Sequence, residues 1–158
     1  TKPIDQSVFL ERIRTIREKY PWIVMQEDDR LIGYAYLSSF HERKAYDWTC
    51  DLSIYLNPDE RGMGYGRKLM DAILDLARKD GYVNVVSIIT SGNEMSEKLH
   101  LSCGFEKKAV FENFGYKNGE WKDVSYYVKK LNEPSDQPAP PQNLDPYSCL
   151  RPHRVPIV

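Results

Sequence analysis

The residues best suited to chemistry form a short glycine-rich segment near the middle of the chain. Gly62, Gly64 and Gly66 alternate with larger residues, and Arg61 and Arg67 flank them. Glycine lets a backbone approach a ligand closely, and free N–H groups at the start of a helix attract phosphate oxygens. With two guanidinium groups beside it, the segment has the chemistry needed to bind a pyrophosphate.

Two common phosphate-binding patterns do not fit this segment. The Walker pattern needs a hydroxyl where the chain has Leu69, and the Rossmann pattern needs its third glycine one residue after Gly66. The pattern that remains is R-x-x-G-x-G, from Arg61 to Gly66. A tight turn without a ligand is the alternative, but the flanking cations and the strand-to-helix context favour ligand binding.

The segment before the glycines, residues 47–56, carries polar groups on one side of a predicted strand. Because side chains alternate across a strand, Asp51 lies on one face, and Cys50 and Leu52 lie on the other. The polar face consists of Asp47, Thr49, Asp51, Ser53 and Tyr55. Polar groups inside a helix-covered sheet need a reason, such as a water-lined cleft. A sheet face exposed to solvent is the open alternative.

A mixed α/β fold must position these residues. Apolar residues at helical spacing, followed by Pro21, predict a helix over residues 5–19. Gly81 ends a second predicted helix, residues 63–80, and Asn93 caps a third, residues 93–102. A helix between strands implies parallel pairing, whereas hairpin turns such as Asn118-Gly119 imply antiparallel pairing. The predicted strands are residues 22–26, 31–38, 47–56, 82–90, 105–117 and 121–131.

Composition excludes several classes of function. The 158 residues include 22 Lys plus Arg and 23 Asp plus Glu, and the net charge of −1 argues against a nucleic-acid partner. No apolar stretch is long enough to cross a bilayer, so no membrane partner is expected. The three cysteines form neither a disulfide framework nor a metal-binding pattern. We therefore expect no metal and a cytoplasmic location.

The last part of the chain differs in composition from the rest. Four prolines between residues 133 and 142 exclude a regular helix there. We therefore divide the chain into a folded domain, residues 1–132, and a proline-rich C-terminal tail, residues 133–158. The tail either trails from the domain or lies across its surface.

Several motifs in the folded domain together carry a family resemblance. Taken in their order along the chain, these motifs resemble the phosphinothricin N-acetyltransferase branch of the GCN5-related N-acetyltransferase (GNAT) superfamily, over nearly all of residues 1–131. The resemblance implies the GNAT fold, a mixed and mostly antiparallel sheet flanked by helices. The family's first strand and helix are expected to be missing before residue 5. The motifs are P-W-I-V from Pro21, G-Y-A-Y from Gly33, A-Y-D-W-T from Ala45, the Arg61–Gly66 loop, Asn93 with Leu99-His100, C-G-F from Cys103, and G-Y-K-N-G-E-W from Gly115.

The same resemblance implies acetyl-CoA as the co-substrate and a primary amine as the acceptor, joined by direct attack in a ternary complex. It places the pantetheine arm beside Ile54, Tyr55 and Leu56, with Asn93 near the end of that arm. The expected acceptor is a small amino acid or an analogue of the phosphinothricin or methionine sulfoximine type. The pyrophosphate would be held by Arg61, Gly62, Met63, Gly64, Tyr65, Gly66 and Arg67.

Catalysis requires that an amine protonated at neutral pH first loses its proton. Asp51 is the candidate base, directly or through water, although the family usually has glutamate there and aspartate is shorter by about 1.5 Å. His100 lies where many members have a tyrosine that protonates the departing thiolate. An ordinary half-buried histidine is the alternative. Tyr46 and Lys117 are the candidate substrate-binding residues.

Two other functions stay open from the sequence. One is a GNAT enzyme that acts on a polyamine, an antibiotic amine or a protein N-terminus. The other is a non-catalytic CoA-binding module, which the aspartate at position 51 would favour. Because members of the family are commonly homodimers, a homodimer is expected.

Overall fold

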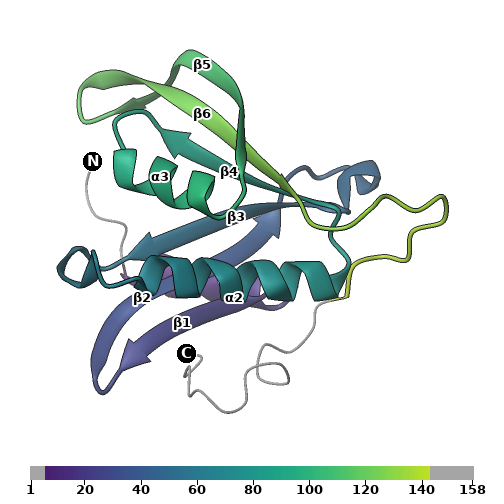
Figure 1. The fold of residues 1–158 in the computed structure, drawn as a ribbon, viewed down its shortest axis with the longest axis horizontal. Coiled ribbons are helices and arrows are strands. Elements are labelled where there is room, and N and C mark those ends of the chain that lie inside the picture. The colour runs from purple at the N-terminus through teal and green to yellow at the C-terminus, as the bar shows by residue number, and fades with distance from the viewer. Residues whose placement is uncertain (1–5, 143–158) are drawn as a thin grey trace.

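A six-stranded sheet with helices on both faces forms the described part of the computed structural model, residues 6–142 (Figure 1). The strand order is β1-β2-β3-β4-β6-β5, and every pairing is antiparallel except that of β3 with β4. This confirms the predicted mixed and mostly antiparallel α/β fold. The elements are α1 (Gln6–Arg17), β1 (Trp22–Glu27), β2 (Arg30–Ser39), η1 (Lys44–Tyr46), β3 (Thr49–Leu56), η2 (Pro58–Glu60), α2 (Tyr65–Asp80), β4 (Asn84–Thr90), α3 (Glu94–Ser102), β5 (Glu106–Lys117) and β6 (Glu120–Lys130).

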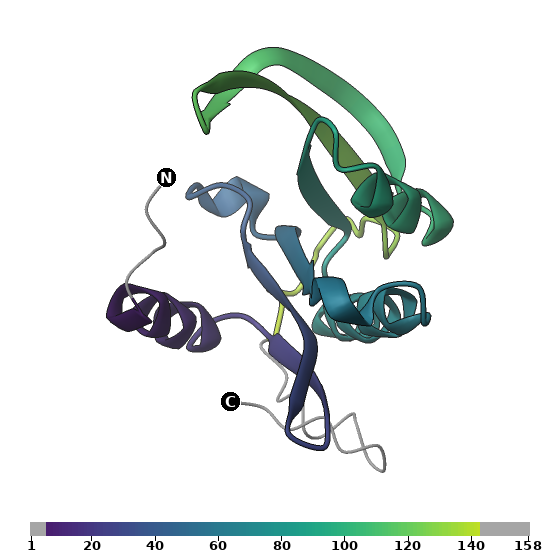
Figure 2. The same ribbon diagram turned by 90° about the vertical axis from the view of Figure 1, so that its left-hand side faces the viewer.

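The helices divide between the two faces of the sheet. Figure 2 shows α2 and α3 on one face and α1 on the other. The apolar stripe of α2 packs against β2 and β3 to form the main core, whereas α1 buries none of its residues. The core side of α2 comprises Leu69, Met70, Ile73, Leu74, Leu76 and Ala77.

Glycines set both ends of α2. The helix begins at Tyr65 rather than at the predicted residue 63, because Gly64 has a left-handed φ of 78°. It ends at Gly81, whose φ is 98° and whose N–H donates to the carbonyls of Ala77 and Arg78. Only glycine adopts such a φ without a steric cost from Cβ. The predicted C-terminal glycine is thus confirmed.

The β5–β6 hairpin bends away from the plane of the other strands. Its turn, Asn118-Gly119, has φ values of 53° and 79°, as the predicted type I′ turn requires. The register of β5 is irregular between Phe111 and Gly115, where the N–H of Asn113 donates to Asp123 Oδ1 at 2.9 Å. Bulges of this kind bend a strand. Figure 2 shows the hairpin arching toward the face that α1 covers.

The first part of the C-terminal tail lies against the domain. The Trp48 indole N–H donates to the Ala139 carbonyl at 2.8 Å, and the Gln142 N–H donates to the Asp80 carbonyl at 2.9 Å. Residues 133–142 contain no helix or strand, in line with their prolines. The remainder of the predicted tail, 143–158, is outside the described residues. Among the helices of residues 6–142, none has the length and apolar character needed to cross a membrane.

Candidate functional site

The main opening in the sheet arises because its one parallel pair is short. β3 and β4 pair only over Thr49–Asp51 and Asn84–Val86. Beyond Asp51 the two strands diverge, and Figure 1 shows them leaving a common end as a V. The buried Ser87 hydroxyl donates to the Leu52 carbonyl at 3.3 Å, just past the last paired residues. The far part of β3 therefore turns an edge without a strand partner toward the opening.

A cleft of about 310 Å³ lies at this divergence. Its walls come from the end of β3, the glycine-rich loop, the start of α2 and the first turns of α3. It contains nine of the eleven residues predicted to bind the cofactor, together with three that the sequence did not single out. The lining residues are Ile54, Tyr55, Leu56, Arg61, Gly62, Gly64, Gly66, Arg67, Asn93, Met95, Ser96 and Leu99.

The glycine-rich loop has the backbone shape of an anion-binding nest. Gly62 and Gly64 have φ values of 83° and 78°, and a Cβ on either would meet nothing within 4 Å. Gly64 is the N-cap of α2 and has no side chain with which to cap the first N–H groups of the helix. These N–H groups and the positive end of the helix dipole favour an anion at this position.

The third glycine allows the starts of two helices to come close together. A Cβ on Gly66 would lie 3.4 Å from Leu99 Cδ2 and 3.7 Å from Leu56 Cδ2. Both separations are ordinary van der Waals contact, so a methyl group would fit here and would occupy space between the two leucines that line the cleft. By having no side chain, Gly66 leaves this part of the cleft open.

Two arginines flank the nest. Arg61 extends across the cleft, and its Nη1 lies 3.7 Å from the sulfur of Met95 on α3. Arg67 is about half exposed and pairs with Asp71 one turn later, at 3.3 Å. Because surface pairs of this kind are weak, the Arg67 guanidinium can be shared with a bound anion. The charges of the two arginines and the backbone shape of the nest thus favour the same ligand, a pyrophosphate.

The first turn of α3 supplies the opposite wall. The Asn93 side-chain oxygen accepts from the Ser96 N–H at 3.3 Å and so caps the helix as predicted. Met95, Ser96 and Leu99 line the cleft with it. The sequence analysis did not single out these three, although Met95 and Ser96 precede Leu99 by four and three residues on a short helix beside Asn93 and so lie on one face with it.

Two residues of the predicted loop do not line the cleft with their side chains. Met63 is 62% exposed. The Tyr65 hydroxyl donates to Glu27 Oε2 at 2.7 Å, which directs its ring toward the end of β1. Their predicted contact with the cofactor stays a prediction, and it would have to come from their backbone N–H groups.

The candidate base occupies the vertex of the V. Asp51 is the last residue of β3 that pairs with β4, and it lies opposite Ser38 of β2. Cys50 and Leu52 are buried in the core beneath α2, so Asp51 lies on the other face, as the alternation predicts. Burial raises the pKa of Asp51 to about 6. The side chain is therefore a carboxylate at neutral pH and can still accept a proton.

The candidate acid, His100, is buried on α3 and is not among the residues that line the cleft. Its Nδ1 lies 2.7 Å from the Ser96 carbonyl oxygen, which can only accept, so Nδ1 carries a proton. Nε2 is buried and has no hydrogen-bond partner within residues 6–142. Burial lowers the pKa of His100, so the ring is neutral at pH 7. Its proton-donor role stays a prediction.

The two candidate acceptor-binding residues lie outside the cleft. Tyr46 is 43% exposed in η1, and its ring centroid is 4.7 Å from that of His41. Lys117 is exposed at the end of β5 beside the hairpin turn. Figure 2 shows η1 and the hairpin on the side of the sheet that α1 covers. Their contact with an acceptor also stays a prediction.

A metal centre has no basis in the described structure. Within residues 6–142, no group of three or more His, Cys, Asp or Glu side chains is arranged to hold an ion. The cleft is lined instead by the glycine-rich loop and two arginines, and the Asp51 carboxylate lies outside its lining, at the vertex of the V.

Comparison with known proteins agrees with this geometry. The family described as "Acetyltransferase (GNAT) domain" matches residues 5–125. The phosphinothricin N-acetyltransferase of Streptomyces viridochromogenes is 28% identical over 95% of this chain and 80% of its own length. The L-amino acid N-acyltransferase MnaT of Escherichia coli is 34% identical over 76% of this chain and 70% of its own.

Solved structures show the same likeness. A phosphinothricin acetyltransferase from Sinorhizobium meliloti, in complex with AcCoA, superposes with a TM-score of 0.78 at 30% identity. The match covers 87% of this chain and 78% of that one. With the divergent β3–β4 pair, the glycine nest and the family match in agreement, the chain belongs to the GNAT family of acetyltransferases.

Proposed function

We propose that the protein is an acetyl-CoA-dependent N-acetyltransferase that acetylates the primary amine of a small amino acid or analogue, of the phosphinothricin or methionine sulfoximine type. The observation that carries the proposal is the cleft where β3 and β4 diverge, which is lined by the glycine nest and by the unpaired edge of β3 at residues 54–56. Asp51 does not line this cleft and lies three residues before Ile54, at the point where the two strands part. The names of the relatives, which include L-methionine sulfoximine/L-methionine sulfone acetyltransferases, support this acceptor class.

The residues of the cleft fit acetyl-CoA. The nest and the start of α2 would hold the pyrophosphate through backbone N–H groups, with Arg61 and Arg67 as counter-charges. The edge of β3 at residues 54–56 would pair with the amide groups of the pantetheine arm. When bound, acetyl-CoA supplies an acetyl group activated as a thioester.

The chemistry needs one proton acceptor before transfer. The ammonium form of the acceptor gives a proton to Asp51, directly or through one water that spans the shorter aspartate side chain. The amine nitrogen then attacks the thioester carbonyl carbon, so that a C–N bond forms, the C–S bond breaks and the electron pair leaves with sulfur. A backbone N–H of β3 near Leu56 would stabilise the negative charge on the carbonyl oxygen.

His100 completes the proposal as the proton donor to the leaving thiolate. The unpartnered Nε2 supports this role, and Ser96 and Leu99 of the same helix line the cleft. Since the neutral ring carries its proton on Nδ1, Nε2 must first receive one. The ammonium nitrogen loses two protons on becoming an amide: one goes to Asp51 before the attack, and the second, lost after the C–N bond forms, balances the proton that Nε2 passes to the thiolate.

The experiment is a continuous assay of CoA release with a thiol reagent over a panel of amines. The panel contains phosphinothricin, L-methionine sulfoximine, L-methionine, a polyamine, an aminoglycoside and a peptide with a free N-terminus. Turnover of the amino-acid analogues above the others is expected. Turnover of only the polyamine, aminoglycoside or peptide would reject the acceptor class. Binding of acetyl-CoA without turnover of any amine would reject the enzyme.

We further propose that the enzyme is a cytoplasmic homodimer. Free cysteines at Cys50 and Cys103 support a reducing compartment. Exposed aromatic residues on the β5–β6 hairpin, namely Phe114, Tyr116 and Trp121 at 60–64% exposure, support a surface that a second copy covers. Light scattering on the purified protein should give twice the mass of the chain, and a monomer at micromolar concentration would contradict this.

A further inference from the structure

A row of aromatic rings links the cleft to α1 on the face that carries Asp51. Tyr55 lines the cleft, and its ring stacks on that of Tyr34 with 5.1 Å between centroids. The two residues are register partners on β3 and β2. The ring centroid of Tyr34 in turn lies 6.4 Å from that of Phe9 on α1. The row therefore forms an aromatic surface between the cleft and α1, on the face of the sheet that carries Asp51.

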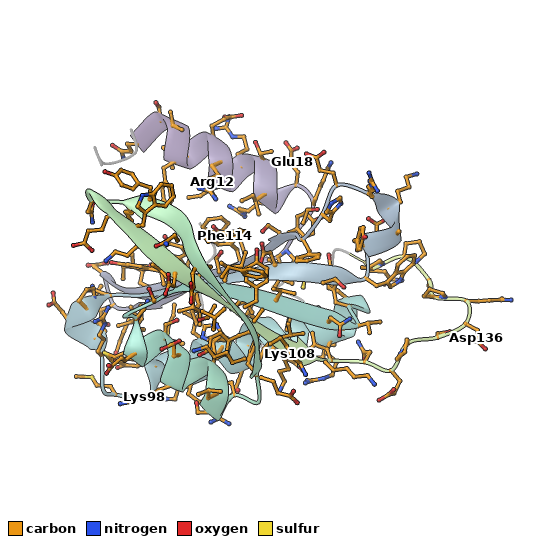
Figure 3. The ribbon with its side chains drawn as sticks, turned by 90° about the horizontal axis from the view of Figure 1, so that it is seen from above. Arg12, Glu18, Lys98, Lys108, Phe114 and Asp136 are labelled. Atoms are coloured by element: carbon orange, nitrogen blue, oxygen red, sulfur yellow. The ribbon has the colours of Figure 1, made fainter. Side chains whose placement is uncertain are left out.

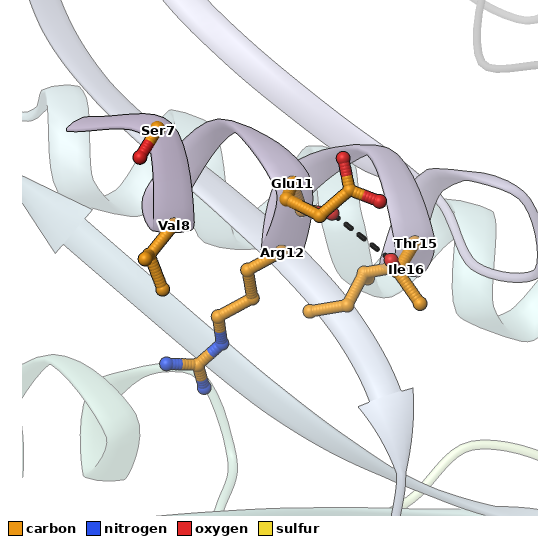
Figure 4. Close-up of a pocket in the computed structure, with 6 residues that line it drawn as sticks. All are labelled: Ser7, Val8, Glu11, Arg12, Thr15 and Ile16. Atoms are coloured by element: carbon orange, nitrogen blue, oxygen red, sulfur yellow. Dashed lines mark hydrogen bonds between the residues drawn. The ribbon is translucent and has the colours of Figure 1, made fainter. Parts of the chain in front are cut away.

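Arg12 lies beside this row. It follows Phe9 by three residues, so both project from the same side of α1. Burial raises the pKa of Tyr34, as do the neighbouring Tyr36 and Tyr55, and the positive charge of Arg12 opposes this rise. Figure 4 shows the Arg12 side chain extended away from the helix, with its guanidinium at the far end.

The guanidinium borders a hollow of about 530 Å³ along α1. The hollow is lined by Ser7, Val8, Glu11, Arg12, Thr15 and Ile16. Glu11, the carboxylate in this lining, forms an ion pair with Arg14 at 3.5 Å. Within residues 6–142, no carboxylate forms an ion pair with Arg12, so its charge is available to a ligand.

The hairpin faces α1 across this region. Figure 3, seen from above, shows Phe114 of the hairpin and Arg12 of α1 on facing elements. Phe114 is 60% exposed, and its ring stacks on that of Phe111 with 4.9 Å between centroids. Arg12 is thus an exposed cation beside an aromatic surface, on the face of the sheet that carries Asp51.

We infer that Arg12 is the residue that selects amino-acid acceptors, by binding their carboxylate while the amine points toward Asp51. An amino acid is a zwitterion at neutral pH, so it needs a cation for one end and a base for the other. A guanidinium matches a carboxylate with two parallel hydrogen bonds. The inference rests on the proposed function and adds to it the residue that sets the acceptor class.

The test compares Arg12→Ala with Arg14→Ala, a matched loss of charge on the other side of the same helix. Each variant is assayed with L-methionine sulfoximine and with a matched amine that lacks the carboxylate. For Arg12→Ala the KM of the amino acid should rise about tenfold to a hundredfold, because a charged hydrogen-bonding partner is lost. The KM of the carboxylate-free amine, the KM of acetyl-CoA and the melting temperature should stay unchanged. Arg12→Lys should recover part of the loss.

The outcomes separate this inference from the proposed function. If the wild-type enzyme acetylates no amine, the proposed function fails before Arg12 is tested. If the wild type is active and Arg12→Ala behaves like Arg14→Ala, the inference is overturned while the function stands. A rise in KM that is equal for both acceptors also overturns it, because Arg12 would then act without regard to the carboxylate.

Discussion

Asp51 and Val86 are the last paired residues of β3 and β4, and the sheet opens directly beyond them. The position of this pair bears both on where the thioester binds and on where the candidate base lies. It marks the point beyond which β3 has no partner on this side, and it places a half-buried carboxylate three residues before Ile54, the first residue of β3 that lines the cleft. Because the strands separate here, a polar residue on β3 can face an opening without breaking the core beneath α2.

Replacing Asp51 with Asn should remove the base and keep the shape. We expect kcat to fall by about 10²- to 10⁴-fold at pH 7.5, with little change in the KM of acetyl-CoA. Steady-state kinetics with both substrates varied would measure this. Asp75→Asn, on the exposed side of α2, is the matched control. Unchanged turnover in the Asp51 variant would remove Asp51 from the role.

Activity should also depend on pH through the same carboxylate. Burial raises the pKa of Asp51 to about 6, so the base becomes protonated below that pH and kcat should fall there. A profile of kcat from pH 5 to 8.5 should show an acidic limb with a midpoint near the pKa of Asp51. A limb that persists in Asp51→Asn with the same midpoint would assign the titration to another group.

The shifted pKa has an opposite consequence for stability. The pKa of Asp51 is higher in the folded chain than its ordinary value of 3.8, so the folded state holds the proton more tightly. Asp51 therefore contributes stability at low pH, and this contribution is lost as the pH rises through about 6. Asp51→Asn should melt at a higher temperature than the wild type at pH 7.5, and the gap should shrink toward pH 4. A variant less stable at pH 7.5 would contradict this.

The nest can be tested with a pair of glycines that share the same backbone strain. Gly64→Ala and Gly81→Ala both place a side chain at a left-handed φ, 78° and 98°, at a cost of roughly 1–2 kcal/mol in folding free energy. Only Gly64 lies in the cleft. Calorimetry should show weaker acetyl-CoA binding, by about tenfold, for Gly64→Ala alone. Equal affinities for the two variants would argue against the nest.

His100 can be tested by a substitution that keeps one of its hydrogen bonds. The amide of Asn at this position can still donate to the Ser96 carbonyl, but it lacks Nε2. If Nε2 supplies the proton to the thiolate, His100→Asn should lower kcat at least tenfold and leave the KM of acetyl-CoA unchanged. Pre-steady-state and steady-state rates would measure this. Unchanged kcat with an altered KM would make His100 a residue that positions α3.

Local patterns predicted the parts of this molecule that depend on neighbouring residues. The left-handed Gly81, the Asn118-Gly119 turn and the cap at Asn93 each follow from a few residues of sequence, whereas the left-handed Gly64 lies inside the predicted helix and was not expected. The placement of Asp51 on the face of β3 opposite Cys50 and Leu52 also follows from the local sequence, because side chains alternate along a strand. These features place the nest and the polar strand face before any long-range contact is known.

Long-range features were not predictable in the same way. The parallel pairing of β3 with β4 stops at Asp51, whereas β4 pairs with β6 from Asn84 to Thr90, and no local pattern encodes this difference. Met95 and Leu99 enter the cleft because α3 lies against the start of α2 at Gly66. Arg12 gains its meaning only once α1 is placed beside Tyr34.

A crystal structure of the protein with CoA would test the central proposal most directly. The measurement is the set of distances from the pyrophosphate oxygens to the backbone N–H groups of residues 62–67. We expect hydrogen bonds to several of these groups, with the pantetheine arm along residues 54–56 and the sulfur directed toward the point where Asp51 and Val86 part. A pyrophosphate bound elsewhere, or a pantetheine arm outside the V, would contradict the proposal.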